Sequence, residues 1–153
     1  MDHSQPARPT LAVVVPAYNE AAVLAQFHAR LAAVFDALDA EGSVLYVDDG
    51  SCDATWQVIC NLAERDPRVA ALRLARNFGK EAALTAGLDQ IDADLALVID
   101  ADLQDPPELI PEFLAKWREG FDVVYGQRLA RDGESWLKRA TAAAFDALLQ
   151  PTS

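Results

Sequence analysis

The 153-residue chain carries 24 acidic and 13 basic side chains, a formal net charge of -11, and 52% of its residues are hydrophobic. A chain of this length and composition supports one hydrophobic core, so we predict a single main domain. The negative charge argues against general binding to the phosphate backbone of nucleic acids. No apolar stretch reaches the ~18 residues of a membrane-spanning helix, and the first ten residues do not resemble a secretory signal. The two cysteines fit neither a disulfide framework nor CxxC spacing, which favours a reducing, cytosolic setting.

Five short runs rich in Val, Leu and Ile recur along the chain. Near-continuous apolar runs of this length are typical of strands that are buried on both faces of a sheet. The runs are Leu11–Val15, Val44–Val47, Val69–Leu74, Leu95–Ile99 and Val123–Tyr125. We therefore predict five buried strands.

Stretches with helical spacing separate these runs. In the clearest, residues 20–40, apolar side chains recur at steps of three and four and form one stripe. The stripe consists of Val23, Leu24, Phe27, Leu31, Val34, Phe35 and Leu38. Further helices are predicted over residues 54–64 with Asp53 as N-cap, 80–90, 107–118 after a Pro-Pro start, and 135–149. This alternation predicts an α/β fold, a mostly parallel sheet with helices on both faces.

Polar residues follow every predicted strand. In an open parallel sheet, ligands bind beyond the carboxyl ends of the strands, so these residues are candidates for a binding site. The segments are PAYNE (16–20), DDGS (48–51), ARNFGK (75–80), DADLQD (100–105) and GQR (126–128). Each one alone is compatible with an ordinary turn or helix cap. Five that converge on one edge of a sheet indicate a site.

The acidic segment after the fourth run predicts a metal site. Asp100 and Asp102 alternate along an extended chain, so their carboxylates can point the same way, and Gln104 adds a neutral oxygen nearby. A Mg²⁺ or Mn²⁺ ion would offset their repulsion and would complete its coordination with water and phosphate oxygens, which predicts a phosphorylated ligand. In the alternative, Asp100 ends a strand, and Asp102 or Asp105 caps the next helix.

The segment after the first run suggests how a nucleotide would be recognised. It has no GxGxxG fingerprint, and the chain has no P-loop, so recognition would rely on side chains. Tyr18 can stack on a base or ribose, and Asp48 can accept a hydrogen bond from a base N–H. Tyr18 is also compatible with a buried aromatic residue at a helix start.

In this order, PAYNE, VDDGS, ARNFGK and DADLQDPPELI, followed by VYGQR and an R..GES..K segment, resemble family 2 glycosyltransferases of the GT-A (Rossmann-like) fold. The chain is most similar to the polyprenyl-phosphate glycosyltransferases, which include dolichol-phosphate mannose synthases and the bacterial enzymes that load glucose onto undecaprenyl phosphate. The resemblance covers nearly the whole chain from Leu11 onward. It implies an incomplete catalytic domain over residues 11–150 after a flexible tail of residues 1–10.

The resemblance also implies residue roles. Nucleotide contacts would come from Pro16, Ala17, Tyr18, Glu20, Asp48 and Lys80, although a lysine at a helix start is more often solvated. Metal and diphosphate contacts would come from Asp100, Asp102 and Gln104. Contacts to the acceptor and donor phosphates would come from Arg128, Arg131 and Lys138. The catalytic residues would be Asp100, Asp102 and Arg128. Arg128, Arg131 and Lys138 lie in residues 128–139, where four basic residues face two acidic ones. In the alternative, this segment is a solvated charged loop.

These expectations describe an inverting transferase that moves a sugar from a UDP- or GDP-sugar to an acceptor, with a polyprenyl phosphate as the expected acceptor. A metal ion would assist departure of the nucleoside diphosphate, and an ionised lipid phosphate would need no strong base. Complete relatives continue with an acceptor-side stretch and transmembrane helices. We therefore expect a C-terminally truncated chain with poor turnover, from a full-length protein that acts at the cytoplasmic face of the membrane. The alternative function is a non-catalytic nucleotide- and metal-binding module.

Overall fold

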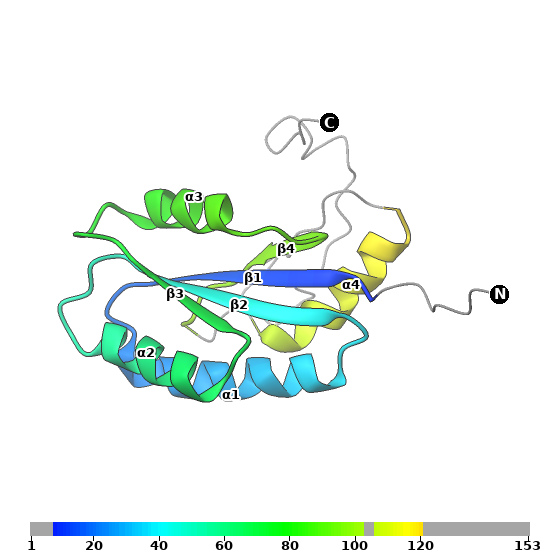
Figure 1. Ribbon diagram of the computed structural model, residues 1–153, viewed down its shortest axis with the longest axis horizontal. Helices are drawn as coiled ribbons and strands as arrows, with labels where there is room; N and C mark the ends of the chain where they lie inside the picture. The colour runs from blue at the N-terminus through cyan, green and yellow to red at the C-terminus, as the bar shows by residue number, and fades with distance from the viewer. Residues whose placement is uncertain (1–7, 103–105, 121–153) are drawn as a thin grey trace, which may run out of the picture. The chain divides into compact units, whose positions relative to one another are not determined.

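The computed structural model describes residues 8–102 and 106–120. The chain forms two compact units, residues 1–107 and 108–153. The first contains β1 (Thr10–Ala17), α1 (Ala21–Ala37), β2 (Glu41–Asp48), α2 (Thr55–Arg65), β3 (Val69–Arg73), α3 (Lys80–Gln90) and β4 (Leu95–Val98) (Figure 1). The predicted α/β alternation is confirmed for these elements.

All neighbouring strands of the sheet are parallel, in the order β3-β2-β1-β4. Helices α1 and α2 lie on one face of the sheet and α3 on the other (Figure 1). The chain builds outward from β1 to β3 and then returns through α3 to place β4 against the free side of β1. The boundary between β1 and β4 is therefore the topological switch point, where α/β sheets bind their ligands.

The two central strands, β1 and β2, form the core of the sheet. The outer strands, β3 and β4, have both buried and exposed residues. Residues 11–15 of β1 and 44–48 of β2 are buried, as the apolar runs predict. In β4, Leu95 and Leu97 are buried, but Val98 is 43% exposed. In β3, Val69 is buried, whereas Ala70 and Ala71 are exposed. The prediction of strands buried on both faces is thus correct for β1 and β2 and wrong for β3 and β4, because these two lie at the edges of the described sheet.

The pairing of β1 differs on its two sides. Residues 10–17 pair with β2 along the whole strand, but only residues 11–14 pair with β4. The last bond on the β4 side runs from the Ile99 amide to the Val14 carbonyl at 3.1 Å. Because alternate residues of a strand face the same neighbour, the next donor on that side would be residue 16. This residue is Pro16, which has no N–H.

The start of α2 differs from the prediction by one residue. The N-cap position is Ala54, not Asp53. The Asp53 carboxylate nevertheless accepts the Thr55 amide (2.9 Å) and the Thr55 hydroxyl, and its second oxygen accepts the Ala21 amide (3.4 Å). The hydrogen bonds from Thr55 lower the pKa of Asp53. Asp53 therefore ties together the starts of α1 and α2.

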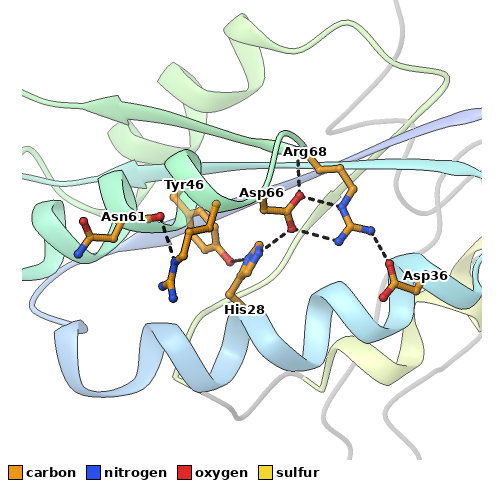
Figure 2. Close-up of polar contacts among 7 residues, drawn as sticks. His28, Asp36, Tyr46, Asn61, Asp66 and Arg68 are labelled. Carbon is orange, nitrogen blue, oxygen red and sulfur yellow. Dashed lines mark hydrogen bonds and ion pairs between the residues drawn. The ribbon is translucent and has the colours of Figure 1, made fainter.

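A polar network on the face covered by α1 and α2 stabilises the first unit (Figure 2). His28 of α1 is buried, with Nδ1 2.7 Å from the Tyr46 hydroxyl and Nε2 3.0 Å from Asp66. Arg68 donates to both oxygens of Asp66, and also to Asp36 of α1, each at 3.0 Å. The hydrogen bonds from Arg68 hold the pKa of Asp66 well below its usual range, and burial raises the pKa of Tyr46. The network joins α1, β2 and the turn before β3.

The remaining described elements are a short 3₁₀ turn, η1 (Pro107–Leu109), and α4 (Ile110–Arg118). They cover the predicted helix of residues 107–118. Lys116 and Arg118 occupy the last turn of α4, where basic side chains favour the helix dipole. None of the helices within residues 8–102 and 106–120 is long and apolar enough to cross a membrane. The predicted strand Val123–Tyr125 and helix 135–149 lie outside the described residues.

Candidate functional site

A cleft of about 290 Å³ opens at the carboxyl ends of β1 and β4, at the switch point of the sheet. It is lined by Pro16, Ala17, Tyr18, Glu20, Asp49, Asn77, Gly79, Lys80, Asp100, Ala101 and Asp102. These residues come from four of the five polar segments that follow the predicted strands. The segments therefore converge in space as their positions in the sequence predict.

The candidate residues divide into three groups. Those that line the cleft are Pro16, Ala17, Tyr18, Glu20, Lys80, Asp100 and Asp102. Asp48 is described but does not line it. Four candidates lie outside the described residues: Gln104, Arg128, Arg131 and Lys138. Asp105, the alternative helix cap, also lies outside them. The binding roles of all of these residues remain predictions.

Asp48 is the last residue of β2 and Asp49 follows it, and of the two only Asp49 lines the cleft. Asp48 is fully buried: one carboxylate oxygen accepts the Ser51 amide at 3.1 Å, and the other is 3.6 Å from Nε of Arg73. That second oxygen has no hydrogen-bond partner among the described residues. Neighbouring residues at a strand end point in opposite directions, which is consistent with only Asp49 lining the cleft. The contact of Asp48 with a nucleotide stays a prediction. The sequence Asp48-Asp49 predicted that this turn contributes to the site, but it did not predict which of the two residues lines the cleft.

The Asp49 carboxylate anchors the loop between β3 and α3. It accepts the Phe78 amide at 2.8 Å, the Gly79 amide at 3.1 Å and the Asn77 side-chain amide at 3.4 Å. The neighbouring Gly50 has φ +70°, and a Cβ built there would lie 2.3 Å from the Arg76 carbonyl carbon. The loop is therefore in direct backbone contact with the turn after β2.

This anchored loop places Lys80 in the cleft. Gly79, with φ +103°, turns the chain into α3, and Lys80 is the first residue of that helix. The Lys80 ammonium lies 2.7 Å from Asp100 Oδ2, although more than half of the Lys80 side chain remains exposed. Lys80 is thus ion-paired rather than merely solvated, and its charge offsets part of the repulsion expected between Asp100 and Asp102.

The cleft concentrates negative charge. Glu20 has a raised pKa, mainly because it is partly buried and also because the charges of Asp102 and Asp100 act on it. Among residues 8–102 and 106–120, no group of three or more His, Cys, Asp or Glu side chains is arranged to hold a metal ion. Mg²⁺ usually takes only one or two protein carboxylates and completes its coordination with water and phosphate oxygens. The hard oxygen donors Asp100 and Asp102, in a cleft where carboxylates repel one another, fit such an ion.

The turn after β1 is held by the loop before α2. The side chain of Asn19, which has φ 53°, accepts the Cys52 amide, and the Asn19 amide donates to the Ser51 hydroxyl, each at 2.9 Å. The Glu20 amide donates to Thr55 Oγ1 at 2.9 Å. Tyr18, which immediately precedes Asn19, is 43% exposed. The buried-aromatic alternative is therefore wrong, and the ring is accessible for stacking.

Comparison with known families agrees with this geometry. Residues 12–149 match the family described as "Glycosyl transferase family 2". The chain belongs to this family. It is 45% identical over 137 residues to an uncharacterized glycosyltransferase of Bacillus subtilis, YkcC, covering 90% of this chain and 42% of that protein. It is 42% identical over 135 residues to the bactoprenol glucosyl transferase of Shigella phage SfV, covering 88% of this chain and 44% of that protein. The chain thus spans less than half the length of these relatives.

The fold is that of the GT-A glycosyltransferases. A solved structure of a mannosyltransferase from Pyrobaculum calidifontis, in complex with GDP-Man and Mn²⁺, superposes with a TM-score of 0.59. The two are 24% identical, and the match covers 78% of this chain and 34% of the mannosyltransferase. This likeness establishes the fold, and the predicted GT-A class is confirmed.

Proposed function

We propose that this chain provides the donor-binding part of an inverting glycosyltransferase, which moves a sugar from a UDP- or GDP-sugar to a polyprenyl phosphate with the help of Mg²⁺ or Mn²⁺. The observation that carries this proposal is the cleft at the switch point. Asp100 and Asp102, which follow β4, line this cleft together with Tyr18 and Glu20 of the turn after β1.

The residues of the cleft suit the parts of a nucleotide-sugar. The exposed ring of Tyr18 is available to stack on a base or ribose. Asp100 and Asp102 would hold the metal, which when bound supplies Lewis-acid stabilisation of the negative charge that grows on the departing diphosphate. Lys80 adds a cation within reach of the same phosphates. In an inverting transfer the acceptor oxygen attacks the anomeric carbon from the side opposite the diphosphate, so these groups would serve the leaving group.

Support for the donor, metal and acceptor comes from the relatives. The solved mannosyltransferase holds GDP-Man and Mn²⁺, which supports a nucleotide-sugar and a divalent cation here. The name of the phage relative, a bactoprenol glucosyl transferase, supports a lipid phosphate as acceptor. A lipid phosphate is largely ionised near neutral pH, because the second pKa of a phosphate monoester is about 6, so it needs no strong general base. Arg128, Arg131 and Lys138 remain our candidates for contacts to the acceptor and donor phosphates.

Isothermal titration with UDP and with GDP, each with and without MnCl₂, tests the proposal. We expect one nucleotide to bind, and to bind at least tenfold more tightly with Mn²⁺. The Asp100→Asn/Asp102→Asn double variant should lose the metal dependence, whereas Asp89→Asn, an exposed acid in the last turn of α3, should behave like the wild type. Failure of both nucleotides to bind under any condition contradicts the proposal.

A sugar-transfer assay separates the enzyme from the alternative module. UDP-glucose or GDP-mannose is incubated with undecaprenyl phosphate, Mn²⁺ and the chain, and the lipid product is separated by chromatography. A glycosylated lipid supports the transferase. Metal-dependent nucleotide binding without any product, not even at the low rate expected of this chain, favours a non-catalytic nucleotide- and metal-binding module.

A further inference from the structure

The ion pair of Lys80 and Asp100 carries an inference that rests on the proposed function. Asp100 is a proposed metal ligand, yet the Lys80 ammonium lies 2.7 Å from one of its oxygens. A divalent cation held by the same carboxylate would lie close to this ammonium and repel it. The two cations are therefore expected to exclude one another at Asp100.

Two features show that Lys80 is placed there by the fold. Three donors from residues 77–79 bind the Asp49 carboxylate, which is almost fully buried. The contact of this loop with Gly50 leaves no space for a Cβ. The backbone is thus fixed one residue before Lys80, while the four-carbon side chain remains flexible enough to move its charge by several ångströms.

We propose that Lys80 neutralises Asp100 in the metal-free cleft and releases it to the divalent cation when a nucleoside diphosphate binds. The released ammonium then pairs with the diphosphate, whose negative charge replaces that of Asp100. Lys80 therefore weakens metal binding to the empty cleft and strengthens it in the presence of the nucleotide. This exchange couples the two ligands, and by linkage each must raise the affinity of the other by the same factor.

The test is to replace Lys80 and measure the two affinities separately. Free Mn²⁺ is followed by electron paramagnetic resonance as MnCl₂ is added to the protein, without nucleotide and then with saturating UDP or GDP. In Lys80→Gln, we expect Mn²⁺ alone to bind about two- to fivefold more tightly, the size of a partly exposed ion pair. The nucleotide that binds the wild type should bind this variant about five- to tenfold more weakly in the presence of Mn²⁺. The factor by which the nucleotide raises the Mn²⁺ affinity should therefore be smaller in Lys80→Gln than in the wild type.

Two control variants make the result specific. Lys80→Arg keeps the positive charge and should leave the Mn²⁺ affinity of the empty cleft within twofold of the wild type. Lys116→Gln removes the same charge from α4, where Lys116 lies 3.5 Å from Glu119, and should change neither affinity. Thermal unfolding of each variant confirms that it is folded, which we expect because the side chains of Lys80 and Lys116 are not buried.

The outcomes separate this inference from the function on which it rests. The exchange is supported if Lys80→Gln binds Mn²⁺ more tightly and the nucleotide more weakly, and if Lys116→Gln shows neither change. Unchanged or weaker Mn²⁺ binding in Lys80→Gln, with the wild type still binding both ligands, overturns the exchange and leaves the proposed function standing. The same effect in Lys116→Gln also overturns it, because a general loss of charge would then be the cause. A wild type that binds neither Mn²⁺ nor nucleotide overturns both.

Discussion

The network around His28 and the cleft around Asp100 both gather charged side chains in the first unit, but they balance those charges differently. In the network, Arg68 binds both oxygens of Asp66, and His28 adds a further contact. Four carboxylates, those of Glu20, Asp49, Asp100 and Asp102, line the cleft, and Lys80 is the one cation among its described lining residues. The pKa values move in opposite directions, down for Asp66 and up for Glu20. In the network, hydrogen-bond donors stabilise the charged form of Asp66, whereas in the cleft the carboxylates repel one another, so a cation would relieve that repulsion.

The largest effect should come from breaking the backbone contact that supports the cleft. Gly50→Ala places a Cβ 2.3 Å from the Arg76 carbonyl carbon at a position with φ +70°. We expect the free energy of unfolding to fall by about 3 kcal/mol, from left-handed backbone strain and overpacking together. Chemical denaturation measures this loss. Gly79→Ala is the control, because its φ is also positive but its Cβ would meet no atom within 4 Å. Gly79 also has ψ 158°, a combination that essentially only glycine adopts, so its backbone strain is large by itself. A loss of less than about 1 kcal/mol in Gly50→Ala would show that the contact is unimportant.

Removing the central charge of the network comes next. Asp66→Asn removes the carboxylate that Arg68 and His28 share and should cost roughly 2 kcal/mol of stability, the scale of hydrogen bonds to charged groups. Asp36→Asn removes the other, largely exposed carboxylate partner of Arg68 and should cost less than about 1 kcal/mol. Urea unfolding of the two variants measures the difference. Equal costs would mean that Asp66 contributes no more than an exposed ion pair.

The lowered pKa of Asp66 also predicts how stability depends on pH. The group is more acidic in the folded than in the unfolded chain, where its pKa is about 3.9. Its contribution is therefore fully present above that value and is lost as the pH falls through the lower, folded pKa. Stability measured from pH 6 to pH 2 should fall less steeply in Asp66→Asn than in the wild type. Parallel curves for the two proteins would contradict this assignment.

The smallest effect on stability should come from the cleft. Asp102→Asn should change the free energy of unfolding by no more than about 0.5 kcal/mol, as is usual for exposed positions. It should also lower the pKa of Glu20 toward its ordinary value, because one repelling charge is removed, while burial keeps that pKa somewhat raised. Carboxyl ¹³C NMR titration follows Glu20 directly. A Glu20 pKa that does not fall would show that the two carboxylates do not interact.

The sequence predicted the fold well because its signals are local and regular. The apolar runs mark β1 to β4, and the stripe on residues 20–40 marks α1, where Leu24, Phe27, Leu31 and Phe35 are indeed buried. His28 was missed, because a polar residue inside a stripe is recognisable only once Tyr46 and Asp66 are brought next to it. The exposure of β3 and β4 was also missed, since strand order decides which strands lie at an edge.

For the site, the sequence identified the segments better than the individual side chains. Placing the site after the strands followed from the parallel topology, and the exposed Tyr18 and the acidic pair lie in the cleft as predicted. The choice between Asp48 and Asp49 depends on where β2 ends, which composition does not fix. The ion pair of Lys80 with Asp100 joins residues 20 positions apart, and it depends on an anchor at Asp49 that no short motif reveals.

Pro16 lies where the pairing of β1 with β4 ends, and it has no backbone N–H. A continuous ladder between β1 and β4 would draw the two strand ends together and close the space above them. The imino acid stops this ladder after Val14, because it lacks the hydrogen that the next rung requires. The peptide after Ile99 is thereby left to diverge, and the acidic residues that follow it line an opening instead of continuing a strand. The missing amide hydrogen of Pro16 thus ends the β1–β4 ladder at the place where the cleft begins.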